Sequence, residues 1–146
     1  MERLLIAVVL AAAALALAWA LQRRQRPDVP VRTGYTVPAQ LDRADFERPE
    51  VPWLVVVFTS ATCDTCAGVW DKARHLGSDE VAVQEAEFSA ARPLHERYAI
   101  EAVPTTLIAD AEGVVVRSFV GPVTATDLWA AVAEAREPGS TPDSCH

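Results

Sequence analysis

The chain has little positive charge, no internal repeat and few potential metal ligands. Its 13 Lys and Arg residues stand against 20 Asp and Glu residues, giving a formal net charge of −7. This balance argues against nucleic acid as a partner. The 146 residues allow one domain of ordinary size plus an appendage. With 51% hydrophobic residues, the chain can form a core even without its N-terminal segment.

A zinc site requires about four ligands within tetrahedral reach. Cys63 and Cys66 would supply two, but His75, His95 and the terminal Cys145–His146 pair lie on segments that are not expected to converge. We therefore predict no metal site. The two internal histidines are expected to be solvated helix residues, and the terminal cysteine a free thiol.

Two cysteines occur where a strand is expected to pass into a helix. The apolar, β-branched run Trp53–Val57 predicts a buried strand. Residues 67–76 have apolar side chains near helical spacing. The unpaired N–H groups and the positive dipole end of that helix would favour a thiolate at Cys63. Cys66, one helical turn further on, can reach back and close a disulfide.

Together with the downstream sequence, this C-x-x-C segment resembles the thioredoxin superfamily. The run Tyr98–Ile108 is similar to the family segment that carries a cis-proline loop and the next strand. Asp110–Gly113 then predicts a hairpin turn, residues 114–120 its return strand, and Gly121 is similar to the glycine that usually follows. The resemblance implies an α/β thioredoxin fold, a mixed central sheet with helices on both faces.

Local patterns predict the other elements. Leu41–Phe46 resembles the family's short first strand and first helix start. Val81–Phe88 alternates as a strand with one polar face, and residues 91–99 predict a short helix. Thr124 is a good N-cap for a last helix, with Asp127 in its first turn. The residues expected to pack in the core are Trp53, Trp70, Leu128, Trp129, Val132 and Ala133.

The resemblance also implies a chemistry. Cys63 would be the exposed nucleophile and Cys66 the more buried resolving thiol. Thr62, Val103 and Pro104 would bind the substrate, because in the family the proline bond is cis and the backbone before it pairs with an incoming chain. The implied reaction is thiol–disulfide exchange with a partner protein through a mixed disulfide. No cofactor beyond the dithiol is implied.

Several positions depart from the family pattern. Thr62 replaces the usual tryptophan, Val57 replaces a buried acid, and Asp71 replaces a proline in the active-site helix. Glu85 and Glu87 include a candidate substitute for that acid, although ordinary strand alternation explains them equally well.

Asp64 and Thr65 replace the family's Gly-Pro dipeptide. The carboxylate of Asp64 should oppose a thiolate at Cys63, whereas the helix dipole favours it. We therefore predict a pKa of Cys63 that is only modestly lowered. The protein would then lie toward the reducing end of the family.

The N-terminal run Leu4–Leu21 is apolar and contains no charge. At about 1.5 Å per residue it can just cross a bilayer core of about 30 Å, and Trp19 suits the interfacial region. We predict a transmembrane anchor over residues 1–22. The alternative is a cleaved signal peptide, for which Ala18–Ala20 offers a site.

The predicted domain organisation continues with a linker over residues 23–37, a thioredoxin-like domain over 38–136 and a disordered tail over 137–146. Arg23, Arg24 and Arg26 follow the apolar run, so the positive-inside rule places the domain in the cytoplasm. Resemblance to membrane-tethered thioredoxin-like proteins favours the extracytoplasmic side instead.

Two classes of function remain open at this point. The first is a single-pass, membrane-anchored thiol-disulfide oxidoreductase that reduces disulfides of partner proteins with its Cys-Asp-Thr-Cys dithiol. The second is a thioredoxin-like interaction module with little or no redox activity, for which Val57 and Thr62 are the supporting departures.

Overall fold

The structure is a computed structural model that describes Met1 and residues 34–140. The predicted anchor, nearly all of the predicted linker and residues 141–146 of the predicted tail lie outside the described residues. Among the described residues, no helix has the length and apolar character needed to cross a membrane. The chain divides into two compact units, 1–30 and 31–146, and the description below concerns the second.

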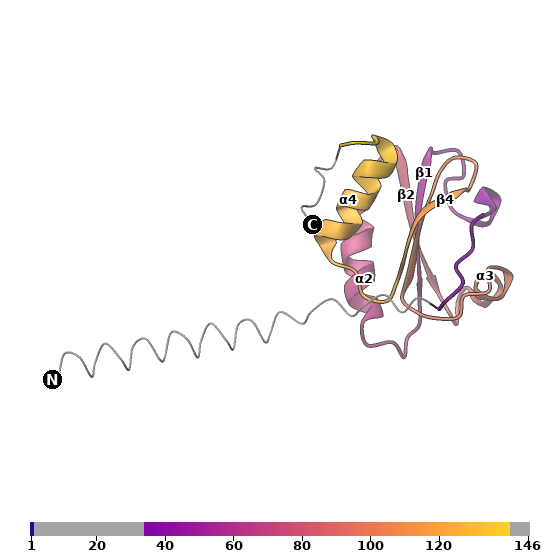
Figure 1. Ribbon diagram of the computed structural model, residues 1–146. Helices are drawn as coiled ribbons and strands as arrows, with labels where there is room; N and C mark the ends of the chain where they lie inside the picture. Colours follow the sequence, from indigo (N-terminus) through magenta and orange to yellow (C-terminus); the bar gives the residue numbers. More distant parts are fainter. Residues whose placement is uncertain (2–33, 141–146) are drawn as a thin grey trace. The chain divides into compact units, whose positions relative to one another are not determined.

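The second unit contains a mixed four-stranded sheet in the order β2-β1-β3-β4 (Figure 1). β1 and β2 are parallel, and the other two pairs are antiparallel. The elements in chain order are the 3₁₀ turn η1 (Arg43–Asp45), β1 (Trp53–Thr59), α2 (Cys66–Ala73), the 3₁₀ turn η2 (Arg74–Leu76), β2 (Val81–Glu87), α3 (Arg92–Arg97), β3 (Thr105–Ala109), β4 (Val115–Val120) and α4 (Ala125–Arg136).

The central strand β1 is covered on both faces, which explains its unbroken apolar run. Helices α2 and α4 lie on one face of the sheet, and α3 and η1 on the other (Figure 1). Val55 and Val57 pack on the α2–α4 face, whereas Leu54, Val56 and Phe58 pack on the opposite face. The sheet is therefore sandwiched between two apolar clusters, as the resemblance implied.

The register brings three chain segments to one end of the sheet. Phe58 near the end of β1 pairs with Thr105 at the start of β3. Thr59 pairs with Glu87 at the end of β2. The loop after β1, the connection after β2 and the loop before β3 therefore leave the sheet side by side. We call this the dithiol end, because residues 60–65 after β1 contain Cys63.

The predicted first strand at Leu41–Phe46 is wrong, whereas the predicted helix start is present as the single 3₁₀ turn η1, with Asp42 as its N-cap. The structure has one isolated bridge between Gln40 and Val114, followed by η1. The carboxylate of Asp42 accepts the N–H of Ala44 at 3.0 Å, which stabilises a tight turn in place of an extended strand. Within the described residues the sheet therefore has four strands.

The last helix begins as predicted, because the Thr124 hydroxyl accepts the N–H of Asp127 at 3.1 Å. Its packing face is different. Leu128 and Val132 are buried with Ala131, but Ala133 is exposed and Trp129 is 51% exposed. One residue along a helix is a rotation of about 100°, so Trp129 beside Leu128 points away from the core.

The predicted hairpin turn at Asp110–Gly113 is present. One carboxylate oxygen of Asp110 accepts the N–H groups of Glu112 and Val114. Gly113 has a φ of 81°, and a Cβ there would lie 2.0 Å from the carbonyl oxygen of Leu41. The backbone N–H of Leu41 also donates to Gly113 at 2.8 Å, so this turn fixes the N-terminal arm, as we call residues 40–51.

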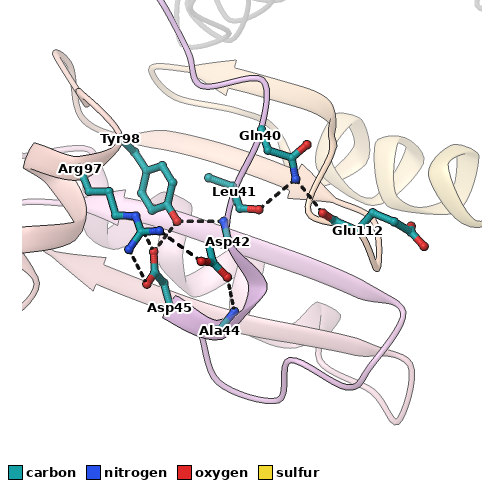
Figure 2. Close-up of polar contacts among 8 residues, drawn as sticks. All are labelled: Gln40, Leu41, Asp42, Ala44, Asp45, Arg97, Tyr98 and Glu112. Atoms are coloured by element: carbon teal, nitrogen blue, oxygen red, sulfur yellow. Dashed lines mark hydrogen bonds and ion pairs between the residues drawn. The ribbon is translucent and has the colours of Figure 1, made fainter.

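A polar cluster joins the N-terminal arm to the end of α3 (Figure 2). Arg97 forms ion pairs with Asp42 at 3.2 Å and Asp45 at 3.1 Å. The Tyr98 hydroxyl donates to Asp45 at 2.5 Å and accepts the backbone N–H of Asp42 at 3.0 Å. Burial, reinforced by the hydrogen bond to Asp45, raises the pKa of Tyr98.

Arg43 completes the attachment of the N-terminal arm. Its side chain is buried, and its guanidinium donates to the carbonyls of Asp110 at 2.9 Å, Val51 at 2.9 Å and Arg48 at 3.4 Å. Burial lowers the pKa of Arg43, while Asp110 and Glu50 act in the opposite direction. The guanidinium thereby joins the arm to the turn at Asp110, and its buried hydrogen bond satisfies the Val51 carbonyl.

Candidate functional site: a dithiol beside a cis-proline loop

Cys63 and Cys66 are joined by a disulfide, with their Cα atoms 5.5 Å apart. Cys66 is the first residue of α2 and is 2% exposed, whereas Cys63 is half-buried. The turn before the helix is held by hydrogen bonds from the N–H of Cys63 to Ser60 at 3.1 Å and from the N–H of Cys66 to Cys63 at 3.4 Å. Cys63 is thus the more accessible sulfur.

The polar residues around Cys63 are short and exposed. Thr62 is exposed, with its hydroxyl 3.2 Å from that of Ser60. Thr65 caps α2 without a side-chain hydrogen bond to the helix, and its hydroxyl lies 3.8 Å from the sulfur of Cys63. Asp64 is exposed next to Cys63, so its carboxylate would oppose negative charge on that sulfur.

The peptide bond between Val103 and Pro104 is cis. Pro104 is buried and Val103 half-buried. The loop is held from two sides: the N–H of Gly121 donates to the Pro104 carbonyl at 2.7 Å, and the Thr105 hydroxyl donates to Ala102 at 2.8 Å. Within the described residues, the N–H and C=O of Val103 form no backbone hydrogen bond. Both groups are therefore available to an extended chain laid beside the loop.

The sheet brings the dithiol loop and the cis-proline loop to the same end. β1 and β3 are antiparallel, and Phe58 pairs with Thr105, so the chain leaves β1 beside the place where it enters β3. Ser60 and Val103 line the same surface hollow of about 250 Å³. Segments about 40 residues apart in the sequence thus form one surface.

Glu87 at the end of β2 holds the dithiol loop. Its carboxylate accepts the backbone N–H of Ala61 at 3.2 Å, of Ser89 at 2.8 Å and of Ala90 at 3.1 Å. Desolvation acts to raise the pKa of Glu87, but these hydrogen bonds together leave it below its usual value. The carboxylate therefore joins the loop after β1 to the connection after β2.

Val57, which the sequence resemblance places where a buried acid is expected, is fully buried. Its neighbours in register are Glu85 and Thr106. Glu85 is half-buried and accepts the Thr59 hydroxyl at 2.7 Å. The Thr106 hydroxyl is buried and has no hydrogen-bond partner among the described residues. The polar groups nearest to Val57 across the sheet are thus a carboxylate and a hydroxyl on its two neighbouring strands.

His75 is exposed, but the prediction of a solvated His95 is wrong. His95 is 4% exposed, and its Nε2 lies 2.8 Å from the Ala86 carbonyl oxygen. Its ring packs edge-on against Phe58 and Phe88, with centroids 5.0 and 5.2 Å apart. Two aromatic side chains from other segments cover this helix position, which the pattern of α3 alone does not reveal.

Sequence reasoning missed the hollow beside the cis-proline loop. Its lining residues are Ser60, Phe88, His95, Ile100, Glu101, Ala102 and Val103. The only signal in the sequence was that Ser60 lies close to the dithiol and residues 100–103 lie close to Pro104. Among the described residues, no group of three or more His, Cys, Asp or Glu side chains gathers as a metal site, and Cys145 and His146 lie outside that part.

Comparison with known proteins gives structural matches only. No family model matches the chain, and no curated protein matches it. A solved structure of thioredoxin-2, described as a component of the malaria parasite's protein secretion machinery, matches with a TM-score of 0.51 and 15% identity, over 57% of this chain and 82% of that one.

A second solved structure, described only as a malarial protein, gives a similar result. It matches with a TM-score of 0.50 and 15% identity, over 57% of this chain and 96% of that one. At this level of sequence identity the two structural matches show the fold alone, so the activity has to be argued from the site.

Proposed function

The chain has the fold of the thioredoxin superfamily and carries a Cys63–Cys66 disulfide, and from this premise we propose that it is a thiol-disulfide oxidoreductase that reduces disulfides of partner proteins. A thiol-redox role follows from the fold and the disulfide together. The observation that supports reduction of a protein client is the open backbone of Val103 at the same end of the sheet as the more accessible sulfur.

The proposed reaction begins from the reduced dithiol. The Cys63 thiolate attacks one sulfur of the client disulfide, forming a mixed disulfide, and the client's other sulfur leaves as a thiolate and takes up a proton. Cys66, deprotonated in turn, attacks the Cys63 sulfur and releases the client's second thiol. Two electrons and two protons pass to the client, and the chain ends as the disulfide.

The surroundings of the dithiol support a reductant in preference to a strong oxidant. A strong oxidant has a strongly stabilised thiolate in its reduced form. Here Asp64 places an exposed carboxylate beside Cys63, which opposes negative charge on that sulfur. We propose a pKa of Cys63 that is only modestly lowered, and a reduction potential near the reducing end of the family. A measured potential near that of a strong oxidase would contradict this.

We further propose that the domain is held at a membrane by residues 1–22, on the apolar run and the arginines that follow it. The arginines favour the cytoplasmic side for the domain. Labelling of Cys145 in intact cells with a membrane-impermeant maleimide tests this. Protection that is lost on permeabilisation supports the cytoplasmic side, whereas labelling of intact cells supports the other.

A trapping experiment tests the redox function. In a Cys145→Ser background, the Cys66→Ser variant should retain Cys63 but be unable to resolve the mixed disulfide. We expect this variant to accumulate a covalent adduct with a disulfide-containing protein such as insulin. The matched Cys63→Ser variant should form none, and only the chain with both active-site cysteines should turn over. Equal trapping by both variants would contradict the assignment of Cys63 as nucleophile.

The competing function is an interaction module with the same fold. Val57 and the exposed Thr62 at family positions of catalytic importance support it. A module would bind its partner equally well with both active-site cysteines replaced by serine. No reduction of insulin by the dithiol form, together with unchanged partner binding by the double variant, would favour the module.

A further inference from the structure

The residues that line the hollow beside the cis-proline loop favour a positively charged occupant. The hollow has a volume of about 250 Å³, enough for one side chain and below the range of about 300–1,000 Å³ that is typical of ligand pockets. Phe88, Ile100 and Ala102 provide apolar lining, and Glu101 is the only Asp, Glu, Lys or Arg side chain that lines it. A hollow of this kind accepts an aliphatic stem and places its end beside a carboxylate.

The carboxylate of Glu101 has no positively charged partner among the described residues. Glu101 is exposed, and within the described part of the chain it has no ion pair or side-chain hydrogen bond. The guanidinium of Arg92 lies over the ring of Phe88, with its carbon 4.9 Å from the ring centroid. Arg92 does not line the hollow, so the negative charge faces whatever enters.

Besides Glu101 and the open backbone of Val103, the polar groups that line the hollow are the side chains of His95 and Ser60, and both can accept hydrogen bonds. The Nε2 of His95 lies 2.8 Å from a carbonyl oxygen, which can only accept, so this nitrogen carries the hydrogen. The remaining ring nitrogen of the neutral imidazole is then an acceptor. The hydroxyl of Ser60 can also accept. An occupant with N–H donors and positive charge satisfies this set, whereas a carboxylate side chain would be repelled.

We propose that this hollow is a specificity subsite for a lysine or arginine next to the reactive cysteine of the client. The proposal rests on the proposed function, because a client chain paired with Val103 passes directly over the hollow that Val103 lines. The side chain flanking the client cysteine then enters the hollow, its stem against Phe88 and Ile100 and its charge beside Glu101. The subsite gives the enzyme a preference for basic segments around client disulfides.

Three disulfide-linked model peptides test the preference. They are identical apart from the residue beside the cysteine, which is Lys, Gln or Glu. The full chain is reduced, freed of reductant and mixed with each peptide, and the second-order rate constant is measured from released thiol. We expect the Lys peptide to react about three- to five-fold faster than the Gln peptide, the range of an exposed ion pair, and the Glu peptide to react most slowly.

Two variants of Glu101 locate the source of the preference. Glu101→Gln should bring the ratio of Lys to Gln rates close to one, and Glu101→Lys should favour the Glu peptide. Glu96→Gln is the matched control, because Glu96 is exposed on α3 and does not line the hollow. It makes the same change in net charge and should retain the wild-type ratio.

The outcomes separate the two proposals. Equal rates for the three peptides, or an unchanged ratio in Glu101→Gln, would overturn the subsite while leaving the reductase intact. Loss of the ratio in Glu96→Gln as well would assign the preference to the overall acidity of the chain and also overturn the subsite. Failure to reduce both the peptides and the small neutral hydroxyethyl disulfide would overturn the reductase itself, and the subsite with it.

Discussion

In the N-terminal arm the Arg43 guanidinium donates to three backbone carbonyls, whereas at the dithiol end the N–H and C=O of Val103 have no backbone partner within the described part of the chain. The arm uses its polar groups to fasten one segment to another. The dithiol end leaves polar groups open beside an accessible sulfur. The two regions thus separate the tasks of holding the fold and of binding a partner.

The largest expected effect is at the turn that fastens the arm. Gly113→Ala should destabilise the domain by about 3 kcal/mol or more, because it combines a left-handed backbone with a Cβ clash against a carbonyl. Urea unfolding of the full chain measures it. Gly68→Ala is the control: Gly68 lies within α2 with nothing within 4 Å of its would-be Cβ, so alanine there should be neutral or stabilising. Equal losses would contradict the role of the turn.

The next effect tests the buried guanidinium. Arg43→Met should cost about 2 kcal/mol, because it removes the hydrogen bonds to Asp110 and Val51 and leaves the Val51 carbonyl without its guanidinium donor. Arg48→Met is the matched control, since Arg48 is exposed and donates to the carbonyls of Ser78 and Asp79. Its unfolding midpoint should shift far less. If the two variants lose equal stability, burial is not what makes Arg43 important.

A smaller effect with a distinctive pH dependence is expected at Tyr98. Tyr98→Phe should cost about 1–1.5 kcal/mol near neutral pH, because the hydroxyl bonds to the arm are lost. The folded pKa of Tyr98 is raised, so its contribution is fully present below the unfolded pKa of about 10 and is lost as the pH rises through the folded value. The difference between wild type and variant should therefore narrow above about pH 10.

The control for this pH dependence is Tyr35→Phe, because Tyr35 is 42% exposed. Its midpoint difference from wild type should stay near zero from neutral to alkaline pH. A gap for Tyr98→Phe that widens above about pH 10 would contradict the direction of the shift.

The smallest effect is expected at the dithiol end, where Glu87→Gln weakens the attachment of the loop. The folded pKa of Glu87 is lowered, so the charged carboxylate stabilises the fold above the unfolded pKa of about 4.3, and that stability is lost as the pH falls through the folded value. At neutral pH the variant should unfold at a lower urea concentration than wild type. In strong acid the two unfolding midpoints should be equal.

Hydrogen exchange locates the same effect. The Ala61 amide should exchange faster in Glu87→Gln, because its acceptor is weakened. Glu96→Gln serves as the control, because it removes the same charge from a side chain that accepts no backbone N–H within the described residues. If Ala61 exchanges at the same rate in all three proteins, Glu87 does not hold the loop.

The sequence predicted the elements whose signals are local. The apolar run from Trp53 gave β1, and Thr124 with Asp127 gave the start of α4. The cis bond at Val103–Pro104 agreed with what the family resemblance implied. In each case the residues that determine the structure are within a few positions of one another or belong to a recognisable motif.

The failures involve contacts between distant segments. The buried side chain of Arg43 donates to the Asp110 carbonyl in a turn 67 positions away, and burial of His95 depends on Phe58 and Phe88. The predicted packing face of the last helix included Trp129, although the spacing of Leu128, Ala131 and Val132 points to another face. The hollow beside Val103 combines four segments and has no signature in any one of them.

The open backbone of Val103 has a consequence for how clients are chosen. A peptide group is the same in every residue, so an edge that offers one N–H and one C=O holds any extended chain with equal ease. Discrimination has to arise beside that edge, from side chains that differ between clients. A protein built this way can exchange one clientele for another by changing a rim residue, while its sulfur chemistry stays as it is.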